Sequence, residues 1–374
     1  MKIQKSEILA ALDTITLPGE GQSMTASGAI QNVVTFGEEV VVDVVLQTPA
    51  LHIKKRAEAD IIQVIHQKVN PNAQVKVNIH VQASDKPKIK GKAIPGIHNI
   101  IAISSGKGGV GKSTVTANLA VSLAKMGFKV GVLDADIYGP SIPMMFDVAL
   151  ERPRSVQVDG KSKMQPIENY GVQVLSIGFF TQPNQAVIWR GPMAAKALNQ
   201  LIFDANWGEL DFMLLDLPPG TGDIHLSIMQ SLPITGAVIV STPQPVALAD
   251  ARKGVAMFRQ ETIDVPVLGI IENMAYFTPA ELPDNKYYIF GKEGAQHLAE
   301  DLDIPFLGEI PLVQSIREAG DVGRPAAMQT HTPLESAFEE LTRRVVEQTV
   351  KRNQSLPPTQ AIKITTMAGC SAVK

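Results

Sequence analysis

The sequence predicts an α/β protein: a mostly parallel sheet with helices on both faces, preceded by a small α+β domain. From residue 99 onward, short apolar runs alternate with segments of helical periodicity, which is typical of parallel strands buried on both sides. A glycine-rich segment joins the first of these runs to the first helical segment. Before residue 84 the order differs, with a helix, a hairpin, a second helix and a strand.

Composition places the chain among globular proteins. Of its 374 residues, 45% are hydrophobic and 19% are charged, and the net charge is −3. This balance creates no global field toward nucleic acid or an anionic membrane, and no run approaches the roughly 18 apolar residues of a membrane span. The single cysteine, Cys370, excludes an intramolecular disulfide. We therefore expect a cytoplasmic protein without a nucleic-acid or membrane partner.

The periodicities give the elements in order. In the first domain, 1–83, we expect a helix over 3–15, a hairpin of strands 29–36 and 40–46, a helix over 57–69 and a strand over 74–81. A polar linker, 84–98, leads to the main domain, 99–350, and a flexible tail follows over 351–374. The strands expected in the main domain are 100–104, 130–134, 172–177, 212–216, 237–241, 267–271 and 306–308.

A phosphate-binding loop lies between the first strand of the main domain and the helix expected from Val115. Its glycines let successive backbone N–H groups converge on a phosphate, and the helix adds its positive N-terminal end. Lys112 would reach the β- and γ-phosphates, and the Ser113 hydroxyl would bind Mg²⁺. The sequence therefore predicts a P-loop NTPase that binds a nucleoside triphosphate through Gly106, Lys107, Gly108, Gly109, Val110, Gly111, Lys112, Ser113 and Thr114.

Aspartates end two of the expected strands at the edge where this loop lies. Asp216 ends an apolar strand, as in the Walker B pattern, and would bind Mg²⁺. Asp134 and Asp136 face opposite ways if extended, so one can face the metal and the other an attacking water. We assign the role of orienting the attacking water to Asp136, which lies further into the loop that follows the strand 130–134.

Lys107 is unusual because it lies inside the phosphate-binding loop itself. Its ammonium group cannot easily fold back onto phosphates held by its own backbone. It is better placed to reach a nucleotide in a facing subunit and to stabilise the transition state, as an arginine finger does. A lysine that only faces solvent is the alternative.

The loop resembles the deviant Walker A motif of the MinD/ParA/nitrogenase-iron-protein class, whose signature lysine acts across a nucleotide-sandwich dimer. Within that class the chain resembles the Mrp/ApbC family of iron–sulfur cluster carrier ATPases, and its first 83 residues resemble an iron–sulfur assembly-type domain. The resemblance implies a homodimer that delivers clusters to recipient apoproteins, with Lys107 acting in trans. It also implies that Asn273 reads the adenine base, with Pro311 near the ring. The matching segments are 134–143, 189–193, 216–223, 242–254 and 271–274.

One departure affects the expected cargo. Cluster ligation in the family is assigned to a C-x-x-C pair shortly after the Glu272-Asn273-Met274 segment, and residues 275–288 contain no cysteine here. Cys370 is the remaining thiol and is named as a possible cluster ligand. Two alternatives therefore stay open: an ATP-gated scaffold or chaperone of the same family without a cluster, and a MinD/ParA-like positioning ATPase. The latter predicts a basic amphipathic terminal helix, which residues 359–374 lack.

Overall fold

The computed structural model divides into two compact units, the first comprising residues 1–87 and 125–128 and the second residues 88–124 and 129–374. Cys370 and the predicted tail beyond residue 356 lie outside the described residues, as do most of the linker, positions 189 and 190, and positions 223, 224, 227, 230 and 231 after Asp216. The structure describes residues 5–15, 23–36, 39–46, 51–81, 94–180, 191–222, 225–226, 228–229, 232–279, 281–282 and 284–356.

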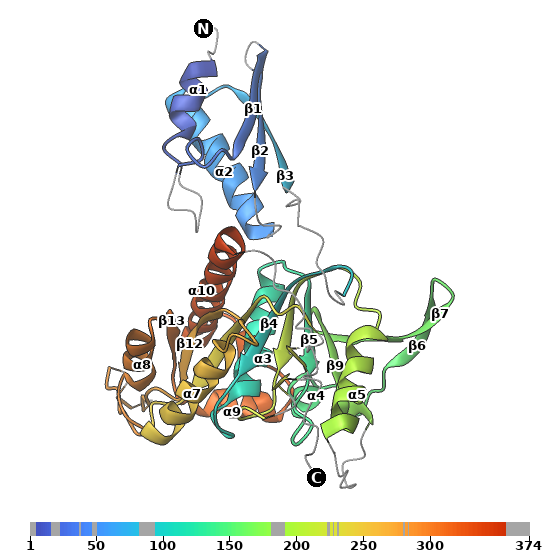
Figure 1. Cartoon of the computed structure of the whole chain (residues 1–374). Helices are drawn as coiled ribbons and strands as arrows, with labels where there is room; N and C mark the ends of the chain where they lie inside the picture. The colour runs from blue at the N-terminus through green and yellow to red at the C-terminus, as the bar shows by residue number, and fades with distance from the viewer. Residues whose placement is uncertain are drawn as a thin grey trace, which may run out of the picture. The chain divides into compact units, whose positions relative to one another are not determined.

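The N-terminal unit is a three-stranded sheet with two helices, in the predicted order of elements (Figure 1). The strand order is β1-β2-β3, with β1 and β2 antiparallel and β2 and β3 parallel. Val40, Val42 and Val44, which alternate along the central strand, are fully buried. Side chains two residues apart point to the same side of a strand, so these valines form the core face of the sheet. The elements are α1 (Lys5–Leu12), β1 (Ile30–Phe36), β2 (Glu39–Leu46), α2 (Leu51–Lys68) and β3 (Gln74–Val81).

The second unit contains a mixed sheet of eight strands in the order β13-β12-β11-β4-β10-β5-β9-β8. All seven predicted strands are present and parallel, and β8 is added antiparallel to β9 at one edge. The strands are β4 (Ile97–Ser104), β5 (Val130–Asp134), β8 (Ile167–Asn169), β9 (Val172–Ser176), β10 (Leu210–Asp216), β11 (Gly236–Ser241), β12 (Val267–Asn273) and β13 (Phe306–Ile310).

Helices cover both faces of this sheet. The connection from β4 through α3 to β5 and the connection from β11 through α7 to β12 run in opposite directions across the sheet. Because such crossovers are right-handed, the two helices lie on opposite faces. The helices are α3 (Lys112–Lys125), α4 (Ile142–Met145), α5 (Gly191–Phe203), α7 (Pro245–Phe258), α8 (Gly294–Leu302), α9 (Gln314–Asp321) and α10 (Pro333–Ser355), with 3₁₀ turns η1 (Ile177–Phe180) and η2 (Ala326–Met328).

Several boundaries differ from the sequence prediction. Helix α3 begins at Lys112, so the end of the glycine loop is already helical, and α10 continues to Ser355, beyond the predicted limit of 350. Hairpin β6 (Arg154–Val158) and β7 (Lys161–Gln165), and strand β8, were not predicted. Across the described part of the chain, each helix is too short or too polar to traverse a bilayer.

Candidate nucleotide-binding site

The carboxyl ends of β4, β5 and β10 meet at one edge of the central sheet. Asp216, the last residue of β10, is the register partner of Asp134 on β5 and of Ile103 on β4. This arrangement places both aspartates beside the loop that follows β4. The polar groups predicted from the strand ends therefore converge, as expected for a ligand site of a parallel sheet.

The loop between β4 and α3 has the backbone that its glycines permit. Gly109 and Gly111 have φ values of +80° and +83°, a region that disfavours other residues. A Cβ on Gly106 would lie 2.1 Å from the backbone carbon of Asp250 in α7, so the loop packs directly on that helix. Val110 is buried, and Thr114 accepts a hydrogen bond at its carbonyl from Asn118 Nδ2 at 2.8 Å.

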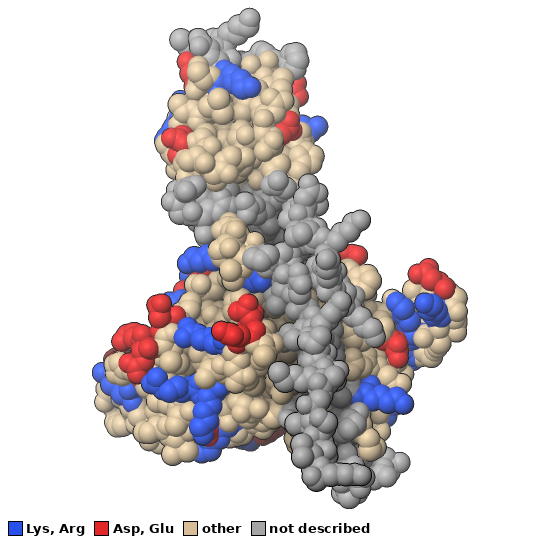
Figure 2. Space-filling model, viewed as in Figure 1, with Lys and Arg blue, Asp and Glu red and all other residues tan. Residues whose placement is uncertain are grey.

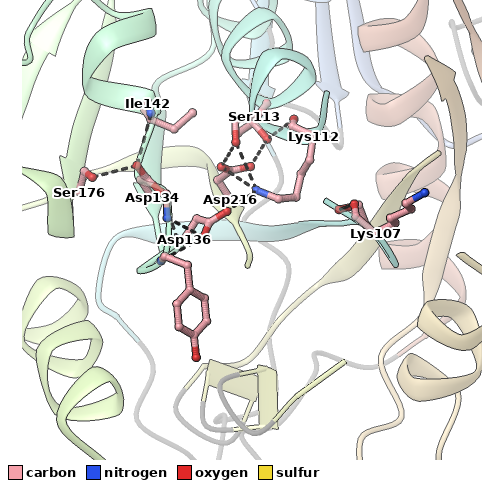
Figure 3. A network of polar contacts seen from close by, with 12 residues as sticks. Lys107, Lys112, Ser113, Asp134, Asp136, Ile142, Ser176 and Asp216 are labelled. Atoms are coloured by element: carbon pink, nitrogen blue, oxygen red, sulfur yellow. Dashed lines mark hydrogen bonds and ion pairs between the residues drawn. The ribbon is translucent and has the colours of Figure 1, made fainter. Parts of the chain in front are cut away.

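Lys112, Ser113 and Asp216 form one polar cluster, in which Lys112 and Asp216 are buried and Ser113 is half-buried (Figure 3). Lys112 Nζ lies 2.9 Å from Asp216 Oδ2, and the Ser113 hydroxyl donates to the same oxygen at 2.5 Å. Asp216 is fully buried and the Lys112 side chain is 6% exposed. In this state the lysine ammonium provides the positive charge that the buried carboxylate requires.

Thr116 completes this cluster and was missed by the sequence prediction. Its hydroxyl lies 2.8 Å from Asp216 Oδ1 and 3.0 Å from the Lys112 carbonyl. Both oxygens of Asp216 therefore have partners from the first turns of α3. The sequence did contain an indication of this role, because Thr116 is a polar residue four positions after Lys112 and therefore lies one turn along the same face of the helix.

Asp134 and Asp136 have different surroundings, as their spacing predicts. Asp136 Oδ2 lies 3.7 Å from Lys112 Nζ, and its Oδ1 accepts from the backbone N–H groups of Tyr138 and Gly139 at 3.3 Å. Asp134 is fully buried and accepts from the Ser176 hydroxyl at 2.8 Å. Asp136 thus belongs to the Lys112 cluster, whereas Asp134 anchors β5 to the end of β9.

Burial raises the pKa of Asp134 from its usual 3.8 to about 8, with a further contribution from the charge of Asp216. The hydrogen bond from Ser176 and the charge of Lys112 act in the opposite direction but do not compensate. In the nucleotide-free protein this carboxyl therefore retains a proton at neutral pH. Its neighbour Asp216 has the ammonium of Lys112 instead.

This proton makes stability depend on pH. Between about pH 4 and pH 8 the folded chain retains a proton that the unfolded chain has lost, so the free energy of unfolding contributed by Asp134 falls as pH rises. We expect Asp134→Asn to remove this decrease of the free energy of unfolding between pH 4 and pH 8. Its stability relative to wild type should therefore be higher at pH 8 than at pH 4. The measurement is urea unfolding without nucleotide, followed by the fluorescence of buried Trp207. Asp301→Asn, in an exposed ion pair, is the control; parallel profiles for Asp134→Asn and wild type would contradict the assignment.

Lys107 lies apart from the cluster. Its side chain is exposed and points away from Lys112 and Asp216 (Figure 3). It forms no ion pair with any residue that the structure describes. The ammonium group is therefore directed outward from its own site. This direction fits both a lysine that acts in a facing subunit and a lysine that only faces solvent, so the role of Lys107 remains a prediction.

Asn273 and Pro311 lie at the ends of neighbouring strands beside the loop. Asn273 is the register partner of Ile310, and Pro311 follows directly. The Asn273 Nδ2 group donates to the Val110 carbonyl at 2.8 Å, and a Cβ on Gly111 would lie 2.1 Å from it. In this state the asparagine amide contacts the phosphate-binding loop. Its reading of adenine remains a prediction.

The segment that departs from the C-x-x-C pattern forms a small closed loop. Phe277 and Tyr287 exchange backbone hydrogen bonds of 2.8 Å, and Lys286 Nζ lies 3.7 Å from the centre of the Tyr276 ring. Lys286 also lies 3.1 Å from Glu309 Oε1. Paired backbone and an aromatic–cation contact hold this loop together. Within the described ranges, no three His, Cys, Asp or Glu side chains are grouped as a metal site.

A glycine loop that continues into a helix beside a strand-end aspartate, at the carboxyl edge of a parallel sheet, defines a P-loop NTPase. Comparison with known families agrees. Residues 96–346 match the ParA family model, described as NUBPL iron-transfer P-loop NTPase, and residues 5–79 match the iron-sulfur cluster assembly protein family. The chain belongs to the ParA family of NUBPL iron-transfer P-loop NTPases.

Individual relatives support this membership. The chain is 43% identical over 325 residues to an iron-sulfur cluster carrier protein of Synechocystis, covering 85% of this chain and 90% of that one. It is 47% identical over 265 residues to the Escherichia coli K12 protein of the same description, covering 71% and 70%. Among solved structures, a nucleotide-binding protein of Archaeoglobus fulgidus in complex with ADP matches with a TM-score of 0.55 and 40% identity, covering 65% of this chain and 92% of that one.

Proposed function

We propose that this chain is a Mg²⁺-dependent ATPase that switches between conformations of a homodimer and delivers iron–sulfur clusters to apoproteins. The observation that supports the ATPase activity is the contact of Lys112 and Ser113 with the buried carboxylate of Asp216 beside the glycine loop. Family membership and the assembly-type domain at residues 5–79 support the cargo. One cysteine in 374 residues fits the reducing cytoplasm, where we propose that the protein works.

The donor groups of the cluster fit a magnesium ion. Hard oxygen donors are the ligands that Mg²⁺ prefers, and Ser113 Oγ and Asp216 Oδ2 lie together. The ammonium of Lys112 contacts the same carboxylate, so this position already accommodates a cation. Ser113 and Asp216 would bind the ion, which would neutralise charge on the terminal phosphate.

Backbone and side-chain groups of the protein would perform the other steps of binding and hydrolysis. Loop N–H groups and Lys112 would bind the phosphates, with Lys112 exchanging Asp216 for a phosphate oxygen. Asp136, held by two backbone N–H groups, would orient the attacking water. Lys107 would complete the site of the partner subunit, and Asn273 with Pro311 would contact the base.

Nucleic acid and membrane are not among the proposed partners. On the face drawn in Figure 2, basic and acidic side chains are interspersed over the described surface rather than separated by sign. A MinD/ParA-like positioning role would require a basic surface or a basic terminal helix. The net charge of −3 gives no overall excess of basic groups, and the sequence of residues 359–374 lacks the pattern of a basic amphipathic helix.

Anaerobic reconstitution of the full chain with ferrous iron and sulfide tests the cargo. We expect visible absorbance that is retained by the dimer after desalting, and its loss in Cys370→Ser would assign the tail thiol as a ligand. Aged apoprotein without sulfide is the control. If wild-type protein gains no chromophore while ATP hydrolysis persists, the ATP-gated scaffold replaces the carrier as the function.

A further inference from the structure

Ser105 connects the phosphate-binding loop to the segment that follows Asp216. The residue is 1% exposed and lies directly after β4. Its hydroxyl donates to the Lys107 carbonyl at 3.0 Å, and its own carbonyl accepts from Gly220 N–H at 2.9 Å. One buried serine therefore contacts both segments. Neither contact involves Lys112 or the Asp216 carboxylate.

Two further contacts run beside it. Leu217 N–H donates to the Ile103 carbonyl at 3.1 Å, and Pro219 lies 3.8 Å from the position that a Cβ on Gly108 would occupy. The segment 217–220 thus lies along the Lys107–Gly108 backbone. Of these contacts, the hydrogen bond from the Ser105 hydroxyl is the one made by a side chain to the Lys107 carbonyl.

The direction of the Lys107 side chain depends on this peptide. Lys107 is exposed and points away from its own cluster, and the first rotatable bonds of its side chain begin at a backbone held by Ser105. Without the hydroxyl, the Lys107 carbonyl loses its partner and the residue can sample other backbone angles. A long side chain amplifies such a change at the ammonium group, which must reach a defined position to act.

We propose that Ser105 is a positioning residue that sets the direction of Lys107 and links it to the loop following Asp216. This inference rests on the proposed role of Lys107 in the facing site. Ser105 therefore supports the hydrolysis step more than nucleotide affinity, because its hydroxyl contacts neither Lys112 nor the other loop N–H groups beyond the Lys107–Gly108 peptide.

Ser104 provides a matched control. It is the preceding residue, is equally buried at 1% exposed, and its hydroxyl has no hydrogen-bond partner among the described residues. Ser104→Ala and Ser105→Ala remove the same atom one position apart. A loss caused by packing alone would appear in both variants, whereas a positioning role appears in Ser105→Ala only.

The test combines single-turnover hydrolysis with titration of a fluorescent ATP analogue on the full chain. We expect Ser105→Ala to slow hydrolysis roughly 3- to 10-fold, the equivalent of one net hydrogen bond, with affinity within about twofold of wild type. Ser104→Ala should match wild type in both. In a Lys107→Ala background, Ser105→Ala should cause no further loss, because both changes act through the same ammonium group.

Three results would overturn the inference: unchanged hydrolysis in Ser105→Ala, an equal loss in Ser104→Ala, or full additivity with Lys107→Ala. A Lys107→Ala variant that hydrolyses at the wild-type rate is a separate outcome. It would reject the proposed role of Lys107 itself and would remove the basis for a positioning residue.

Discussion

Replacement of Lys112 by alanine is expected to weaken ATP binding by about 100-fold or more, because truncating one partner of a buried charge contact costs several kcal/mol. The variant is also expected to destabilise the nucleotide-free protein by about 3 kcal/mol, since Asp216 would be left buried without its ammonium partner. Calorimetric titration and urea unfolding measure the two effects.

Lys129→Ala is the control for this experiment, because Lys129 is an exposed lysine of the same unit. It should change neither affinity nor the unfolding midpoint appreciably. ATP affinity in Lys112→Ala equal to that of wild type would remove the basis for placing phosphates on this loop. Unchanged stability would show that Asp216 does not depend on the lysine for its charge balance.

Lys107→Ala is expected to give a different result: ATP affinity near that of wild type and hydrolysis reduced by about 10³-fold or more, the effect of losing an arginine-finger-type cation. The physical reason is the geometry of the loop. Lys112 and the loop N–H groups remain in place, whereas the removed ammonium points out of its own site. An equal loss of binding and hydrolysis would indicate a role within the same subunit.

Mixing the two inactive variants separates the trans role from the cis role. In a heterodimer of Lys107→Ala with Lys112→Ala, one site combines an intact Lys112 with an intact Lys107 from the other subunit. Random pairing of equal amounts should then restore about a quarter of the wild-type sites. A cis-acting Lys107 predicts no recovery at any ratio. The same mixture therefore tests the homodimer and the assignment of the residue together.

The central sheet and the site edge were predictable because they depend on local patterns. Apolar runs marked the seven parallel strands, and a strand-end position placed Asp134 and Asp216 at the same edge, where the structure makes them register partners. The phosphate-binding loop follows from spacing alone. Each of these signals lies within about ten residues of sequence.

The missed features depend on contacts between distant segments or on a signal that was overlooked. Thr116 and Ser176 bind aspartates 100 and 42 positions away, and a polar residue in a buried element does not reveal its partner. Hairpin β6–β7 did carry a signal: Asp159 and Gly160 both have positive φ and form the turn that this pair favours. Its strands are polar, so they lack the apolar runs that mark the strands of the central sheet.

The ion pair between Lys112 and Asp216 has a consequence for selectivity. Because the Lys112 ammonium contacts the Asp216 carboxylate at 2.9 Å, a free divalent cation must compete with this tethered cation for the same oxygen, which lowers the affinity of the site for the free ion. Phosphate offers the lysine an alternative partner and thereby releases the carboxylate. Binding of Mg²⁺ at Asp216 should consequently depend on the concentration of nucleotide and only weakly on the concentration of free Mg²⁺.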